Sequence, residues 1–290
     1  MELFLSTLIN GLSLGGIYAM IALGYTMVYG IAKLLNFAHG DIIMVGAYTV
    51  FTTLILGNSL TVKIIAILLS VAFCTLLGIA VEKFAYRPLR GASPLAVLIT
   101  AIGVSYLLQG TAQLIFGAKS QPVDFTVPGN VAGFNLSTIL TLAVATVIMV
   151  SLTIFVKFTK TGRAMIAVSE DRSAAQLMGI NVNKIITVTF AIGSALAACA
   201  SIFYLMQIPS TSPTLGSMPG IKAFTAAVIG GIGSIPGAMI GGVLLGLIEK
   251  ISLSIPALAP YTTAIEFSLL ILILLVKPTG ILGKKRREKV

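Results

Sequence analysis

The chain has 290 residues, of which 57% are hydrophobic and only 10% are charged, and its mean hydropathy is +1.04. Soluble domains carry about 25% charged residues, so this composition excludes a soluble enzyme, a disordered chain, a coiled coil and a disulfide scaffold. The 19 Lys and Arg outnumber the 9 Asp and Glu. These basic residues lie between long apolar runs, where they indicate membrane orientation rather than nucleic-acid binding.

Eight apolar segments follow one another along the chain. A membrane-spanning helix needs about 20 mostly apolar residues, and continuous apolar runs do not fit the alternating strands of a membrane β-barrel. The first run has no cationic stretch before it, so we expect a retained helix rather than a signal peptide. The fold class predicted is an all-α polytopic membrane protein, with residues 1–290 forming a single transmembrane domain. The segments comprise residues 3–32, 42–56, 62–81, 94–117, 136–156, 185–206, 223–248 and 261–276.

The positions of Lys and Arg predict which loops face the cytoplasm, because cytoplasmic loops retain basic residues. Of the 19 basic residues, 15 fall on one consistent side of the membrane. That side contains the loop at residues 157–184 and the tail at residues 277–290. We therefore predict that this loop and the tail are cytoplasmic, and that the N-terminus and residues 118–135 face outside.

One apolar segment must break or re-enter the membrane. Three segments separate the basic loop at 157–184 from the basic tail, and three simple crossings would place them on opposite faces. Residues 223–248 are the best candidate, because the sequence GGIGSIPG at residues 230–237 interrupts them. The alternative is one long helix kinked at Pro236, with its glycines packing tightly against other helices. We predict non-helical or sharply bent backbone within the membrane at residues 232–238.

Residues 35–41, Leu-Asn-Phe-Ala-His-Gly-Asp, place an amide, the only histidine and a carboxylate next to an apolar helix. At a membrane boundary the stretch would be a polar helix cap, with Asp41 capping the helix that follows. Deeper in the membrane, such side chains are costly and usually serve a function. Both interpretations stay open on the residues alone. One His and one Asp do not fill a coordination shell, so we expect no metal site.

The loop at residues 157–184 is predicted to be structured. Residues 161–168 form a short helical run, and Asp171 caps a second run at residues 172–178, which Gly179 ends. This apolar face needs a cover, and we favour a protein partner over packing on the chain's own helix ends. The face consists of Ala164, Met165, Ala167, Val168, Ala174, Ala175, Leu177 and Met178.

The sequence lacks the motifs of an enzyme. No GxxxxGK[ST] phosphate loop is present, so we expect the chain not to bind ATP itself, and a single histidine leaves no credible Ser/His/Asp triad. Ion or proton relays need ionisable groups in the membrane interior. Glu266, about a turn and a half into the last segment, is the candidate for such a group. The alternative is a boundary residue that faces a polar gap between helices.

Three stretches together resemble the permease subunits of branched-chain amino acid ABC importers, and most closely the LivH-type subunit. Each stretch alone is weak, but together they are specific, and the resemblance spans almost the whole chain. The stretches are residues 35–41 with Met44, Gly46, Ala47 and Tyr48; residues 161–164 with Asp171, Ala174, Ala175, Gly179 and Ile180; and residues 230–238 with Gly241, Gly242, Gly246 and Glu249.

The resemblance implies a transport subunit without a motor of its own. In this family the permease pairs with a second, LivM-like permease, two ATP-binding cassette ATPase subunits and an extracytoplasmic solute-binding protein in the plasma (inner) membrane. The general coupling signature of ABC importers begins Glu-Ala-Ala; here Ser173 replaces the acid and the later Leu-Pro element is missing, which leaves the contact chemistry open. The residues implied for ATPase coupling are Gly162, Arg163, Ala164, Asp171, Ala174, Ala175 and Gly179.

We interpret the chain as a permease subunit of an ATP-driven importer for branched-chain amino acids, with no catalytic residue, cofactor or metal of its own. One alternative is a urea or amide importer permease, and others are a stand-alone ion-coupled carrier or channel and a structural membrane scaffold. Importers of this kind select their solute largely through the binding protein. The residues expected along or beside the translocation path are Asn36, His39, Gly40, Asp41, Gly233, Ser234 and Gly237.

Overall fold

A computed structural model describes residues 2–131 and 133–283 of the chain. Residues 284–290, half of the predicted basic tail, lie outside the described residues. Strand β1 pairs with β4, and β2 with β3, both antiparallel. The elements are α1 (Glu2–Ala32), α2 (His39–Leu54), α3 (Leu60–Val81), α4 (Pro94–Phe116), β1 (Gln121–Pro122), β2 (Asn130–Val131), β3 (Phe134–Asn135), α5 (Leu136–Phe158), α6 (Lys160–Glu170), α7 (Arg172–Leu177), α8 (Val182–Gln207), β4 (Ser210–Thr211), α9 (Ser217–Gly230), α10 (Ile235–Ser254) and α11 (Thr262–Val276).

Among the described residues, seven helices are long and apolar enough to cross a membrane, which confirms the all-α polytopic fold. They lie in α1, α3, α4, α5, α8, α10 and α11. The remaining apolar helices, α2 and α9, have only 16 and 14 residues, fewer than the roughly 20 that one crossing needs. Each of them follows a non-helical stretch, at residues 33–38 and 208–216, respectively. Stretch and short helix together therefore make one crossing.

The first turns of α2 and α9 meet inside the bundle. Asp41, the third residue of α2, accepts a hydrogen bond from Gln109 at 2.8 Å, and Gln109 lies about 22 Å along α4 at a rise of about 1.5 Å per residue. The start of α9 reaches the same depth, because Gly216 and Gly220 pack against Gly40 of α2. Only glycine permits this approach, since a Cβ on Gly220 would lie 2.9 Å from the Gly40 Cα atom.

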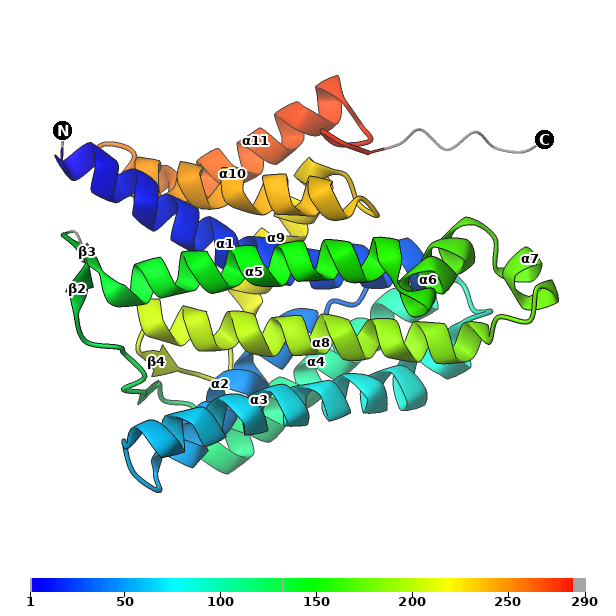
Figure 1. The fold of residues 1–290 in the computed structure, drawn as a ribbon, viewed down its shortest axis with the longest axis horizontal. Coiled ribbons are helices and arrows are strands. Elements are labelled where there is room, and N and C mark those ends of the chain that lie inside the picture. The colour runs from blue at the N-terminus through cyan, green and yellow to red at the C-terminus, as the bar shows by residue number, and fades with distance from the viewer. Residues whose placement is uncertain (1, 132, 284–290) are drawn as a thin grey trace.

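Different loops and short elements lie at the two ends of the bundle (Figure 1). The N-terminus and the short strands β2, β3 and β4 lie at one end, and α6, α7 and the end of α11 lie at the other. The loops at residues 118–135 and 157–184 are thus at opposite ends, as the distribution of basic residues requires. Which end faces the cytoplasm stays a prediction from that distribution.

The predicted break in the segment 223–248 exists, but it is shorter than predicted. Helix α9 ends at Gly230 and α10 begins at Ile235, so the prediction is confirmed for residues 232–234 and wrong for residues 235–238, which are helical. Pro236 lies in the first turn of α10, where a missing N–H has no helical partner to lose. The turn is also not at mid-depth, because Gly233 packs near Gly30, close to the end of α1.

The break gives the chain an extra reversal of direction. Four segments, α8 to α11, now separate α7 from the end of α11, so both lie at one end of the bundle. The residues after α11 hold the turn in place: the N–H groups of Ile281 and Leu282 donate to the carbonyls of Ile229 and Gly230 at 2.8 and 2.9 Å. These carbonyls at the end of α9 would otherwise lack partners.

Helix α1 forms the centre of the core, and small residues bring α10 close to it. A Cβ atom on Gly242 or Gly246 would overlap the backbone of Ala19 or Gly15 on α1. Gly241 instead lies against α9. Tight packing through glycines, which was the alternative to a broken segment, therefore occurs together with the break.

Candidate translocation site

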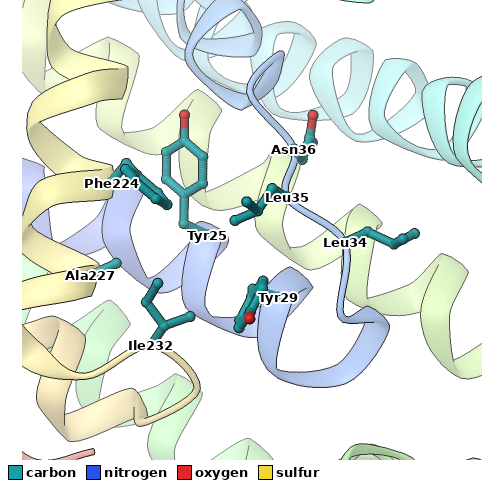
Figure 2. Close-up of a pocket in the computed structure, with 8 residues that line it drawn as sticks. All are labelled: Tyr25, Tyr29, Leu34, Leu35, Asn36, Phe224, Ala227 and Ile232. Carbon is teal, nitrogen blue, oxygen red and sulfur yellow. The ribbon is translucent and has the colours of Figure 1, made fainter. Parts of the chain in front are cut away.

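The two predicted pathway stretches border one crevice near the end of α1, on the side of the bundle where α6 and α7 lie (Figure 2). Asn36 comes from the stretch before α2, and Ile232 comes from the turn between α9 and α10. The crevice encloses about 10 Å³, which is roughly the space that one water molecule needs. It is therefore closed to any amino acid. The other lining residues are Tyr25, Tyr29, Leu34, Leu35, Phe224 and Ala227.

The side chains predicted on the pathway make contacts within the chain itself. The Asn36 side chain is buried and accepts a hydrogen bond from the Tyr86 hydroxyl at 2.8 Å. The ring of His39 packs edge-on against Tyr25, with centroids 4.7 Å apart. Ser234 caps α10 by accepting a hydrogen bond from the Gly237 N–H at 3.2 Å. Ile232, rather than Ser234, Gly233 or Gly237, contributes the lining of the crevice.

The cap interpretation of Asp41 is wrong. The N-cap residue of α2 is Ala38, and no side chain caps this helix. Asp41 lies in the first turn, is 2% exposed, and accepts from the side-chain amide of Gln109 on α4. A buried carboxylate at this depth is the costly arrangement that usually serves a function.

The loop at 157–184 folds as the helical pair α6 and α7. The Asp171 carboxylate accepts hydrogen bonds from the N–H groups of Ser173 and Ala174 at 2.9 and 3.0 Å, which confirms the predicted cap of the second helix. Gly179 follows the helix with a φ of +80°, as predicted for the residue that ends it. The pair lies at one end of the bundle, beyond the end of α5 (Figure 1).

The apolar face of this helical pair divides into two parts. Met165, Val168 and Ala175 are buried against the chain's own helices, as are the main chain and Cα of Gly162 at the turn from α5. The packing alternative is therefore correct for these residues, and Ala175 is not on an exposed docking face. Leu177 and Met178 are 89% and 82% exposed and form the apolar tip of α7. Arg163, Ala174 and Gly179 are exposed as well.

Polar contacts attach α7 to the membrane helices. The guanidinium of Arg172 donates to the carbonyl of Ala32, the last residue of α1. Because the stretch at residues 33–38 begins there and lines the crevice, the helical pair and the crevice share one backbone connection. Nearby, Glu82 accepts from Thr187 at 2.7 Å and pairs with Arg90, which also binds Asn183 at the start of α8.

The family model described as "Branched-chain amino acid transport system / permease component" matches residues 7–275 of the chain. The chain belongs to this permease family. The permease is 43% identical, over 99% of its length and 98% of the relative's, to the high-affinity branched-chain amino acid transport system permease protein BraD of Pseudomonas aeruginosa. With the same coverage, it is 42% identical to LivH of Escherichia coli strain K12. A chain of PsaBC from Streptococcus pneumoniae in complex with Fab aligns at a TM-score of 0.47 and 17% identity, covering 96% of the permease and 93% of that chain.

The permease buries an ion network, of which the sequence analysis singled out Glu266 as a candidate ionisable group. The Lys222 Nζ atom lies 2.9 Å from Glu249 Oε2 and 3.2 Å from Glu266 Oε1. The Tyr18 hydroxyl donates to Glu249 at 2.7 Å. The network joins α1, α9, α10 and α11, so Glu266 pairs with a cation rather than facing a gap at the boundary. A lysine directly before the apolar segment 223–248, an acid directly after it and a second acid in the last segment were the available signal.

The described residues hold no cluster for a metal ion. No three His, Cys, Asp or Glu side chains in this part of the chain lie close enough to bind one. The site consists of two short helices, α2 and α9, whose first turns meet inside the bundle, and of a closed crevice on the side of α6 and α7. The helical pair α6–α7 is hydrogen-bonded to the end of α1, next to the stretch that lines this crevice.

Proposed function

We propose that this permease is a membrane-spanning subunit of an ATP-driven importer for leucine, isoleucine and valine. The observation that carries the proposal is the 43% identity to BraD over 99% of the chain. The match to the family model runs from α1 into α11, so it covers the whole bundle rather than one motif. The chain itself hydrolyses no ATP; ATPase subunits supply the energy.

The apolar tip of α7 is the proposed ATPase contact. Leu177 and Met178 protrude from the bundle, and an exposed apolar patch at the end of a membrane protein is typical of an interaction site. The ATPase groove takes up this tip, and Arg172 transmits its displacement to Ala32 at the end of α1. The stretch at residues 33–38 then moves with α1, which opens or closes the crevice around Asn36.

A second, LivM-like permease completes the translocation path in this proposal. Only 17% and 11% of the residues in the most apolar stretches of α4 and α11 are buried within this chain. These helices therefore leave apolar surface for both lipid and a partner. A solute-binding protein delivers the amino acid at the opposite end of the bundle from α6 and α7, where residues 118–135 lie. The subunit resides in the plasma (inner) membrane with its N-terminus outside and its C-terminus in the cytoplasm.

Uptake in cells tests the proposed function. Deletion of the gene should abolish high-affinity uptake of labelled leucine, and expression of the chain should restore it. An excess of unlabelled isoleucine or valine should compete, and urea should not. Competition by urea alone would assign the solute to the amide class. Uptake that persists without the ATPase partner but stops when ion gradients collapse would identify a stand-alone carrier.

A further inference from the structure

The contact between α2 and α4 forms a seam with a regular composition. The two helices run in the same direction. Asp41 contacts Gln109 at the inner end, and Met44 and Ala112 lie in one buried cluster farther along. At the outer end the ring of Tyr48 stacks on Phe116, with centroids 4.2 Å apart and planes 10° apart. The seam therefore has a polar inner end and an apolar middle.

Asp41 has only neutral partners. Its carboxylate accepts hydrogen bonds from Gln109 and Ser105 of α4, and Gln109 also lies 3.5 Å from the hydroxyl of Ser217 at the start of α9. In the described part of the chain, the ion pairs join Arg90 with Glu82 and Lys222 with two other glutamates, so none reaches Asp41. The first turns of α2 and α9 offset part of the charge. A cation from outside the chain would complete the balance.

A second polar group on the seam also lacks a partner. Tyr48 is 3% exposed, and its hydroxyl makes no hydrogen bond within the described residues. Buried tyrosine hydroxyls usually find a partner, so the free hydroxyl is independent evidence of a polar ligand. Met44 and the small Ala112 belong to the same buried cluster as Tyr48 and make this part of the seam apolar.

The seam leads to a cavity at the outer end of the bundle. Phe51 packs against both Tyr48 and Phe116, at centroid distances of 6.4 and 6.2 Å, and also lines this cavity of about 200 Å³. Asp124 also lines this cavity, and hydrogen bonds from Thr126 and Asn58, together with the Lys63 ammonium, lower the pKa of its carboxyl group. The outer cavity is thus much larger than the inner crevice. A cationic group that enters through it passes the Asp124 carboxylate, whose charge Lys63 partly offsets, on the way to Asp41.

We propose that Asp41, held by Gln109, is the subsite that recognises the ammonium group of the transported amino acid. An ammonium donates three hydrogen bonds and supplies the positive charge that the neutral partners of Asp41 do not provide. The rest of the amino acid lies along the apolar Met44 and Ala112, toward Tyr48. A neutral amide such as urea can donate a hydrogen bond to Asp41 but brings no positive charge. The inference rests on the proposed function and names where the solute is bound.

Two substitutions of one residue separate recognition of charge from a structural role. The complete transporter, with both permeases, the ATPases and the binding protein, is reconstituted in proteoliposomes and tested for leucine uptake. Asp41→Asn keeps the shape and can still accept from Gln109 but loses the charge, so uptake should fall by about 30-fold or more. Asp41→Glu keeps the charge and should retain more uptake than Asp41→Asn. Thr146→Val, on the exposed side of α5, is the matched control and should transport normally.

The relative leucine uptake of Asp41→Asn and Asp41→Glu distinguishes recognition of charge from a packing role. If Asp41→Asn transports as well as the wild type, or better than Asp41→Glu, the residue serves packing and the proposal is overturned. If the wild-type assembly itself takes up no leucine, the proposed function fails instead, so the two failures are distinguishable.

A labelling experiment covers the case in which Asp41→Asn does not assemble. Ala112→Cys is introduced into the otherwise wild-type transporter and treated from outside with cationic or anionic thiol reagents. The cationic reagent should react at least about tenfold faster, and leucine should slow the reaction. Equal rates for the two reagents, or no protection by leucine, would contradict an ammonium subsite on the seam.

Discussion

The substitution Gly162→Ala tests how firmly the helical pair α6–α7 is attached to the bundle. A Cβ atom at Gly162 would lie 2.5 Å from the Cα atom of Val156 and still closer to the carbonyl oxygens of Phe155 and Val156. Real Cβ atoms essentially never come within 3.0 Å of such neighbours. All three neighbours are backbone atoms of α5, so no side chain can rotate away. Helix α6 must shift by about 0.5 Å or more, the difference between these two distances.

The energetic effect has two opposing parts. Overpacking of this kind costs about 1–3 kcal/mol, and the better helix propensity of alanine offsets up to about 1 kcal/mol. With the full offset the net loss is up to about 2 kcal/mol, which shifts the equilibrium constant between the attached and the detached pair by up to about 30-fold toward the detached state. Leucine uptake should fall with it, because the ATPase tip and the crevice are connected through this pair.

Gly110→Ala on α4 is the matched control, because open space surrounds a Cβ atom there. This variant gains the higher helix propensity of alanine without a clash. It should therefore raise the thermal unfolding temperature of the purified protein, whereas Gly162→Ala should lower it. Wild-type stability together with wild-type uptake in Gly162→Ala would refute the attachment.

Further predictions concern topology, coupling and the ion network. In intact cells an impermeant thiol reagent should label Lys119→Cys but not Gln176→Cys; the reverse pattern would invert the orientation. Leu177→Asp should change the free energy of unfolding by less than about 0.5 kcal/mol, since the side chain is 89% exposed, yet lower leucine uptake at least about tenfold; normal uptake would remove this tip from the ATPase contact. Lys222→Met leaves Glu249 and Glu266 buried without their cation and should cost about 3–5 kcal/mol in denaturant unfolding, more than Glu266→Gln, which keeps the pair with Glu249; equal losses would contradict the network.

Local features of the fold were predictable from the sequence. The cap at Asp171 and the helix end at Gly179 depend on a few neighbouring residues, so residue type and spacing were sufficient. The break after Gly230 followed from counting crossings against the distribution of basic residues. The extent of the break could not be predicted in this way, because proline disrupts the interior of a helix but is tolerated in its first turn. Only the position of Ile235 as the first helical residue shows which case applies.

Long-range features were beyond the reach of sequence pattern. Asp41 was equally compatible with a helix cap, and only its contact with Gln109, 68 residues later, places it at mid-depth. The same holds for Ala175, which shares an apolar run with Leu177 but points to the opposite side of α7 and is buried. In a helix of six residues the period of 3.6 is sampled too briefly to show which face is covered.

Leucine uptake by the reconstituted transporter tests the central claim most directly. Proteoliposomes that contain this chain, its partner permease and the ATPases receive labelled leucine with the binding protein outside and ATP inside. The account predicts accumulation against a gradient that requires ATP hydrolysis and stops when the binding protein is left out. Accumulation that follows an ion gradient and needs neither ATP nor the binding protein would contradict it.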